Sequence, residues 1–189
     1  MAGRVQGRLD SPLTAKGIEQ ARALAVRLGD EKINYIYSSD APRALATATE
    51  IQTALDLTVQ IRPVPALREF SFGDWEGHRW SELRELFPDA FAVWDSGPHL
   101  VQIPGGESME LVADRAWQFL EGVLPQHPDE TICIVTHGLT LKLLVGRALG
   151  FGVHQWAETP WQFNTALNIL TWDGREFRAE MLGDCSHLE

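Results

Sequence analysis

A histidine directly follows an apolar run in the second half of the chain. Residues 131–136 read Thr-Ile-Cys-Ile-Val-Thr, and the inner four residues, all apolar, are typical of a parallel strand covered on both sides. His137 and Gly138 come next, and a helical pattern of leucines begins at once. The carboxyl ends of strands in open α/β sheets and the N-termini of helices both favour anionic ligands. The pattern predicts that His137 meets an anionic substrate, and a capping or packed histidine is the alternative.

An arginine occupies a second junction of the same kind. A short strand is expected at residues 33–37, a polar turn follows it, and a helix is expected over residues 41–55 with Arg43 in its first turn. A cation at this end of a helix opposes the helix dipole. An anion bound beside the guanidinium would offset that placement. Arg43 is therefore a candidate anion ligand, with a solvated surface arginine as the alternative.

The loop over residues 67–77 is dense in aromatic and acidic side chains. Surface loops rarely carry Phe70, Phe72 and Trp75 together, so we expect this loop to pack on other elements. An apolar environment favours the protonated form of a carboxyl group, as a general acid requires. Glu69 is the candidate acid, and a simple ion pair with a basic neighbour is the alternative.

The remaining patterns indicate an α/β fold. The first 13 residues lack a strand pattern and are expected to form a loop. Strands alternate with helices until a final hairpin around Asp173-Gly174. This order predicts a mixed, mostly parallel sheet between helical layers. The further elements expected are helices at 14–28, 109–124 and 139–149, a strand at 59–62, and hairpin strands at 166–172 and 176–181.

An excursion interrupts this alternation. Two short helices are expected at residues 81–87 and 89–95, divided by Pro88, and glycine- and proline-rich loops follow them. Such an insertion is a natural lid over a site. We expect one domain over residues 1–189, with a lid-like helical insertion at about 74–107.

Composition narrows the classes of function. The chain has 189 residues, of which 44% are hydrophobic, so it can bury one substantial core. A formal net charge of −10 argues against nonspecific binding of nucleic acid or of an anionic membrane. No apolar run approaches the ~20 residues that span a bilayer, and the pattern of the first residues does not predict a signal peptide. Cys133 and Cys185 are too few for a disulfide framework or a zinc site, and a cytoplasmic, reducing location is expected.

Five segments, in this order, resemble the histidine phosphatase superfamily, which has the phosphoglycerate mutase-like fold. The resemblance covers essentially the whole chain, and the loop at residues 73–77 is similar to that of the broad-specificity phosphatase branch. Each segment alone is weakly specific, whereas five in the correct order are specific. The segments are Gly3–Gly7 with Asp10–Thr14 and Gly17, Ser38-Ser39 with Arg43-Ala44 and Thr47-Ala48, Leu67–Glu69 with Gly73–Gly77, Pro104–Ser108, and Val135–Gly138.

The resemblance implies a site for a phosphoryl group. Arg43 and His137 would hold the phosphoryl group, and Glu69 would protonate the leaving oxygen. Phosphoryl transfer depends mainly on positioning and charge neutralisation, which suits such a set. The resemblance implies no metal and no cofactor, and a three-layer α/β/α fold with a mostly parallel sheet. Further substrate contacts are implied at Gln6, Ser108 and Gly138.

One departure from the family pattern affects the whole interpretation. The family's nucleophile is a histidine in an Arg-His-Gly motif at the end of the first strand, upstream of the loop that residues 3–7 resemble. The chain has six histidines, and none stands in an Arg-His-Gly context. We therefore expect the nucleophile and the first central strand to be missing, and Met1 to be an assigned start within a longer reading frame.

The missing strand should leave a structural defect. The resemblance implies that this strand lies between the strands at 33–37 and 131–136, so each would keep an unpaired edge. A buried unpaired backbone group costs ~1–3 kcal/mol. We expect closure of the two strands on each other, a strand from another chain, or a homodimer to cover the edges.

The leading functional interpretation is a phosphatase-family protein for small phosphomonoesters, acting through a phosphohistidine and impaired or inactive without the nucleophile. One alternative is a noncatalytic member that binds phosphate or forms dimers, and another is a phosphoglycerate mutase-type phosphotransferase. The expected partner is a small phosphorylated metabolite or inorganic phosphate. An apolar specificity pocket, or else core and lid packing, is expected from Trp75, Trp80, Trp94, Trp156 and Trp161.

Overall fold

Three parallel strands form the central sheet of the computed structural model, which describes residues 3–29 and 31–189. They are β1 (Tyr35–Ser38), β2 (Ile61–Pro63) and β3 (Ile132–Val135), in the order β2-β1-β3. β1 and β3 pair with Tyr35 opposite Ile132 and Ser38 opposite Val135. The expected strands are present, although β1 and β2 each begin two residues later than the sequence pattern predicts.

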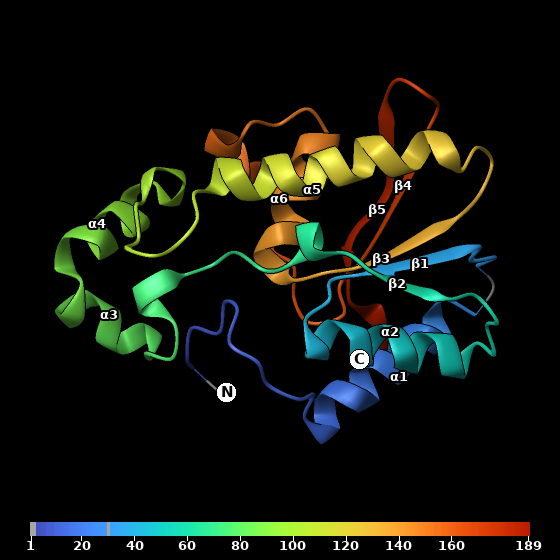
Figure 1. The fold of residues 1–189 in the computed structure, drawn as a ribbon, viewed down its shortest axis with the longest axis horizontal. Helices are drawn as coiled ribbons and strands as arrows, with labels where there is room; N and C mark the ends of the chain where they lie inside the picture. The colour runs from blue at the N-terminus through green and yellow to red at the C-terminus, as the bar shows by residue number, and fades with distance from the viewer. Residues whose placement is uncertain (1–2, 30) are drawn as a thin grey trace.

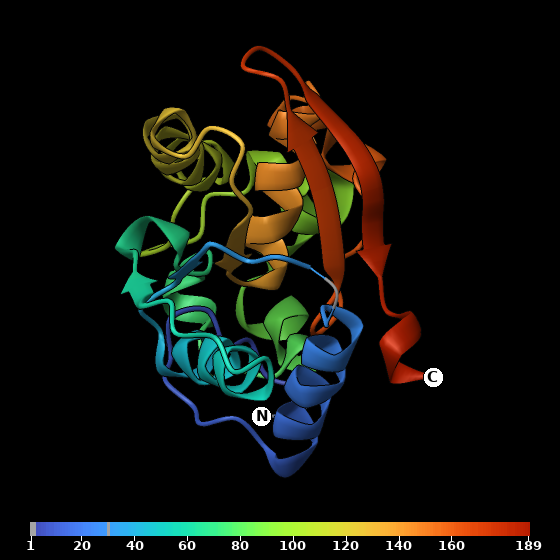
Figure 2. The same cartoon turned by 90° about the vertical axis from the view of Figure 1, so that its right-hand side faces the viewer.

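Two layers of helices cover this sheet (Figures 1 and 2). α1 (Ala15–Arg27) and α2 (Pro42–Ala54) lie on one face, and α5 (Met109–Val123) and α6 (Gly138–Ala148) lie on the other. Side chains alternate along a strand, so Cys133 and Val135 pack with the first pair, whereas Ile132 and Ile134 pack with the second. The three-layer α/β/α arrangement predicted from the sequence is confirmed.

Local capping explains where two of these helices begin. The Thr14 hydroxyl accepts a hydrogen bond from the Gly17 N–H at the start of α1. The Ser108 hydroxyl accepts one from the Leu111 N–H at the start of α5. Each bond satisfies a backbone donor that the first turn of a helix leaves unpaired.

The insertion consists of α3 (Trp80–Leu86) and α4 (Pro88–Ser96), which are separated at Phe87 as the proline predicts. Its aromatic rings pack on one another, for example Trp75 on Trp94 with ring centroids 5.7 Å apart. The N-terminal loop lies against it, because Val5 is buried and exchanges backbone hydrogen bonds with residues 77 and 78. Short 3-10 segments occur at Pro65–Leu67, Gly73–Trp75, Pro98–Leu100, Leu124–Gln126, Val153–Glu158 and Ser186–Leu188.

The C-terminal hairpin forms a separate antiparallel sheet. β4 (Leu167–Trp172) and β5 (Phe177–Asp184) pair with each other and with no other strand in the described residues. The Asp173 carboxylate accepts hydrogen bonds from the N–H groups of Arg175 and Glu176, which holds the predicted turn. The expected single mixed sheet is thus divided in two.

The interruption of the sheet does not lie between the strands at 33–37 and 131–136, where it was expected. Because β1 pairs directly with β3, the expectation of a gap between these two strands is wrong. Within residues 3–29 and 31–189, the side of β3 away from β1 pairs with no strand, and it lines the same cavity as β4 of the hairpin. None of the helices in the described ranges is long and apolar enough to cross a membrane.

Candidate phosphoryl site

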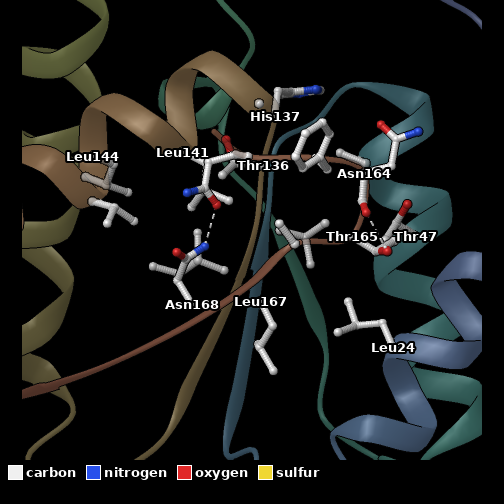
Figure 3. Close-up of a pocket in the computed structure, with 18 of the residues that line it drawn as sticks. Leu24, Thr47, Thr136, His137, Leu141, Leu144, Asn164, Thr165, Leu167 and Asn168 are labelled. Carbon is white, nitrogen blue, oxygen red and sulfur yellow. Dashed lines mark hydrogen bonds between the residues drawn. The ribbon is translucent and has the colours of Figure 1, made fainter. Parts of the chain in front are cut away.

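A cavity of about 1760 Å³ extends along β3 and reaches Thr136 and His137 beyond its carboxyl end (Figure 3). Five of the six residues proposed from the sequence as site residues line this cavity, although they come from four distant parts of the chain. The sixth, Ser108, is not among the lining residues. The five are Gln6, Arg43, Glu69, His137 and Gly138.

His137 is buried at the end of β3, immediately before α6. Its Nε2 lies 2.8 Å from the Ser39 hydroxyl oxygen. Burial, together with the positive charges of Arg43 and Arg115, lowers the pKa of His137 to about 3, against an opposing effect of Asp40. The imidazole is therefore neutral at physiological pH, and it can offer a hydrogen bond without repelling the nearby guanidinium.

Arg43 lies in the first turn of α2, as predicted, and its side chain points into the cavity region rather than into bulk solvent. Its guanidinium donates hydrogen bonds to the carbonyl oxygens of Leu9 at 3.0 Å and Gly7 at 2.6 Å. Burial lowers the pKa of Arg43, and the carboxylate of Glu69 is the largest opposing influence. A guanidinium has several N–H donors, so donors remain for an anion in the cavity.

The Glu69 carboxylate lies at the amino end of α6. It accepts hydrogen bonds from the N–H groups of Leu139 at 3.3 Å and Thr140 at 3.2 Å, and from the N–H of Phe70 at 2.8 Å. The Thr140 hydroxyl lies 3.1 Å from the same carboxylate. The immediate surroundings of Glu69 are thus polar, unlike the apolar setting expected from its loop, because backbone N–H groups and the Thr140 hydroxyl contact its carboxylate.

Arg115 and Glu107 support the site from behind. Arg115 donates to both carboxylate oxygens of Glu107 at 3.1 Å and also to the carbonyl oxygen of Glu69 at 3.2 Å. Burial opposes the charge of Glu107, but hydrogen bonds from Arg115 and from the Ser71 N–H lower its pKa. This pair fixes the backbone of the loop that carries Glu69.

Two predicted contact residues have hydrogen bonds within their own segments. The Gln6 side-chain amide donates to the Ser11 hydroxyl, which fixes the amide at the cavity wall. The Ser108 hydroxyl caps α5 and is used there. The structure therefore brings Gln6 to the candidate site but does not bring Ser108.

Aromatic side chains form part of the cavity wall. Phe72 contributes from the loop before the insertion, Trp80 and Trp94 contribute from the insertion, and Trp156 and Trp161 contribute from the segment after α6. Trp75 is fully buried in the core of the insertion and does not reach the cavity. Of the five tryptophans considered for an apolar pocket, four line the cavity, and Trp75 packs in the core instead.

The sequence reading missed several supporting residues. Ser39 and Thr140 are fully buried and hold His137 and Glu69, respectively. Arg115 is distant in sequence from both groups that it influences. Ser39 had a visible signal, because it lies in the polar turn beside Arg43, whereas Arg115 falls within an ordinary helical pattern.

The site combines a half-buried guanidinium, a neutral imidazole and a carboxylate at the carboxyl end of a parallel strand. This set can bind a tetrahedral anion and exchange a proton with one of its oxygens. No group of three or more His, Cys, Asp or Glu side chains in the described residues is arranged to hold a metal ion. Fold and site together place the chain among α/β proteins with an anion-binding type of site at the carboxyl ends of their strands.

Comparison with known proteins identifies the family. The profile of the histidine phosphatase superfamily (branch 1) matches residues 1–185, so the chain belongs to this superfamily. The chain is 34% identical over 189 residues to a metal-independent phosphoserine phosphatase of Arabidopsis thaliana, covering 99% of this chain and 77% of the relative.

Solved structures agree with this assignment. The chain superposes on Bacillus stearothermophilus YhfR with a TM-score of 0.92 and 35% identity, covering 99% of this chain and 92% of that one. It superposes on a mycobacterial glucosyl-3-phosphoglycerate phosphatase in complex with VO3 with a TM-score of 0.86 and 28% identity, covering 97% and 92%. The α/β fold with a mostly parallel sheet is therefore that of phosphoglycerate mutase-like histidine phosphatases.

Proposed function

We propose that this chain forms the substrate side of a phosphomonoesterase that works through a phosphohistidine, and that it needs a nucleophilic imidazole from outside these 189 residues. The observation that carries the proposal is the convergence of Arg43, Glu69 and His137 on one cavity. Such convergence from distant segments is difficult to explain by packing alone, because burial disfavours the charges of Arg43 and of a protonated His137.

Each residue has a role that follows from its position. Arg43 neutralises charge on the phosphoryl oxygens, and neutral His137 donates a hydrogen bond to one of them. The attacking imidazole forms a bond to phosphorus while the ester P–O bond breaks, and Glu69 gives its proton to the departing alkoxide. Water then attacks the phosphohistidine, Glu69 takes back a proton, and inorganic phosphate leaves.

The proposed substrates are small phosphomonoesters, and the proposed location is cytoplasmic. The aromatic wall formed by Trp80, Trp94, Trp156 and Trp161 favours a substrate with an apolar or sugar-like body beside its phosphate. Relatives with phosphoserine and glucosyl-3-phosphoglycerate phosphatase names support a small phosphorylated metabolite.

A second candidate function is noncatalytic binding of phosphate. It is favoured by one observation, namely that none of the six histidines stands in an Arg-His-Gly context. A phosphoglycerate mutase-type phosphotransferase is the third alternative, and it requires the same nucleophile.

The test compares hydrolysis of an aryl phosphate by this chain and by the chain extended upstream with an apolar strand that ends in Arg-His-Gly. We expect turnover only in the extended chain. In that chain, Glu69→Gln should lower kcat by about a hundredfold or more, whereas Asp74→Asn, in the same loop but outside the cavity lining, should leave kcat unchanged. Absence of turnover in both chains, with phosphate still bound, would support the binding protein.

A further inference from the structure

A second pocket lies outside the candidate phosphoryl site. It has a volume of about 470 Å³ and is formed by the first half of α5, the second half of α6 and the segment from α6 to Thr159. This volume is within the ~300–1,000 Å³ typical of sites for small ligands. Trp156 lines both cavities, whereas Arg43, Glu69 and His137 line only the phosphoryl cavity.

A buried lysine lines this second pocket. Lys142 of α6 is 3% exposed, and its Nζ donates a hydrogen bond to the carbonyl oxygen of Thr159. The Nζ lies 5.1 Å from the ring centroid of Trp156 and 6.0 Å from that of Trp161. Such cation–π contacts attract the ammonium but do not neutralise its charge.

The ammonium of Lys142 has no acidic partner in the part of the chain that the structure describes. Burial lowers the pKa of Lys142, and no carboxylate counteracts this effect. An ammonium has three N–H donors, so two remain beside the one that Thr159 accepts. A buried charge is unfavourable unless it is paired and hydrogen-bonded. An anion in the pocket would supply the partner that the chain does not.

A hydroxyl of the same pocket is also without a partner. Thr159 is 1% exposed, and its Oγ1 makes no hydrogen bond within residues 3–29 and 31–189. It lies against α6 at Gly146, where an added Cβ would be 2.7 Å from this Oγ1. Buried hydroxyls without a partner are uncommon. Since Lys142 binds the carbonyl of the same residue, the hydroxyl and the ammonium are two neighbouring donors for one anion.

The charged side chains at the exposed side of the pocket limit the charge of that anion. Glu110 and Asp114 of α5 are exposed lining residues, as is His154. Asp114 pairs with Arg147 at 2.5 Å, which leaves Glu110 as the negative charge at the entrance. A carboxylate there repels a dianion more strongly than a monoanion.

We propose that this pocket binds a small monocarboxylate with an apolar body. The carboxylate would accept hydrogen bonds from Lys142 and from the Thr159 hydroxyl. The apolar body would lie against Leu143, Phe151 and Val153, which also line the pocket. The inference concerns a second site and does not depend on the proposed phosphatase chemistry.

The test is calorimetric titration with benzoate and with benzamide, an uncharged molecule of nearly the same shape. We expect benzoate to bind at least about tenfold more tightly than benzamide, because only benzoate can pair with the Lys142 ammonium. Arg43→Ala should leave the benzoate affinity unchanged, because Arg43 lines the other cavity.

Three variants locate the binding site. Lys142→Met removes an unpaired buried charge while keeping an unbranched apolar side chain, so it should fold and bind benzoate about tenfold or more weakly. Thr159→Val removes the hydroxyl at nearly constant shape and should weaken benzoate binding by about threefold to tenfold. Lys32→Met, at an exposed lysine that lines neither cavity, should leave it unchanged.

Four results would overturn the inference. They are no saturable binding of benzoate by the unaltered chain, equal affinities for benzoate and benzamide, an unchanged benzoate affinity in Lys142→Met, and loss of benzoate binding in Arg43→Ala. Failure of the chain to bind orthophosphate would count against the proposed function alone, because that anion is expected in the other cavity.

Discussion

The electrostatic state of His137 is the main residue-scale feature of the site. An imidazole beside Arg43 and within range of Arg115 would be unstable as a cation, and burial adds to this effect. The protein therefore keeps a neutral hydrogen-bonding group next to a permanent cation. This combination suits an anion that needs one charge partner and one oriented hydrogen bond.

The stability of the fold should depend on pH through His137. Its pKa is about 3 in the folded chain and near 6.5 when unfolded, so the unfolded chain binds a proton first as the pH falls. The stability that this residue contributes is complete above pH 6.5 and declines below it by about 1.4 kcal/mol per pH unit. Urea unfolding between pH 6 and pH 4 should show this decline, and His137→Gln should show a shallower one, because the lowered pKa of His187 still contributes. Equal slopes in the two proteins would contradict the assigned pKa.

Ser39 should position His137. Ser39→Ala removes the buried hydroxyl that pairs with Nε2 and leaves the imidazole unsatisfied, at a cost of about 1–3 kcal/mol in the free energy of unfolding. Ser96→Ala, at an exposed hydroxyl at the end of α4, is the control and should change stability by less than about 0.5 kcal/mol. If Ser39→Ala lowered the free energy of unfolding no more than the control does, Ser39 would not position His137.

At the scale of elements, the site depends on close contact between two loops. Gly73 has a φ of +49°, and a Cβ built on it would lie 2.1 Å from the Pro104 carbonyl oxygen. The next residue, Asp74, donates a backbone hydrogen bond to the same Pro104 carbonyl oxygen at 2.9 Å. The insertion is thus fastened to the segment that leads into α5.

Two alanine substitutions should have opposite effects. Gly73→Ala introduces both a left-handed strain and a backbone clash and should lower the free energy of unfolding by at least about 1–3 kcal/mol. Gly122→Ala lies in α5, where a Cβ meets nothing within 4 Å, and should raise it by about 0.4–1 kcal/mol. Thermal unfolding of both variants checks the pair. A neutral Gly73→Ala would show that the two loops are not held together.

At the scale of the whole molecule, the elements were predictable because their signals are local. Thr14, the apolar stripe that follows it, and the turn at Asp173-Gly174 each act within one or two turns of chain. Ser108 carries a capping signal, and capping is what its hydroxyl does. The location of the open strand edge was not predictable from these signals, because strand order depends on which elements pack together.

The residues of the candidate site also fall into two groups, those that local sequence signals predicted and those that they did not. Arg43, Glu69 and His137 were found from junctions and motifs, and the structure brings them to one cavity. Arg115 and Glu107 were not found, because their effect comes from contacts between segments far apart in the sequence. The same limit applies to the polar surroundings of Glu69, which the amino end of α6 supplies.

Binding of orthophosphate, measured by calorimetry at low ionic strength, tests the central claim most directly. The account predicts that the chain binds phosphate and that Arg43→Ala weakens binding by about tenfold to a hundredfold, as expected for loss of a charged hydrogen bond. Arg22→Ala is the matched control, because Arg22 is an exposed arginine paired with Glu50 outside the cavity lining, and it should leave the affinity unchanged. Equal affinity in Arg43→Ala and in the unaltered chain would contradict the phosphoryl site.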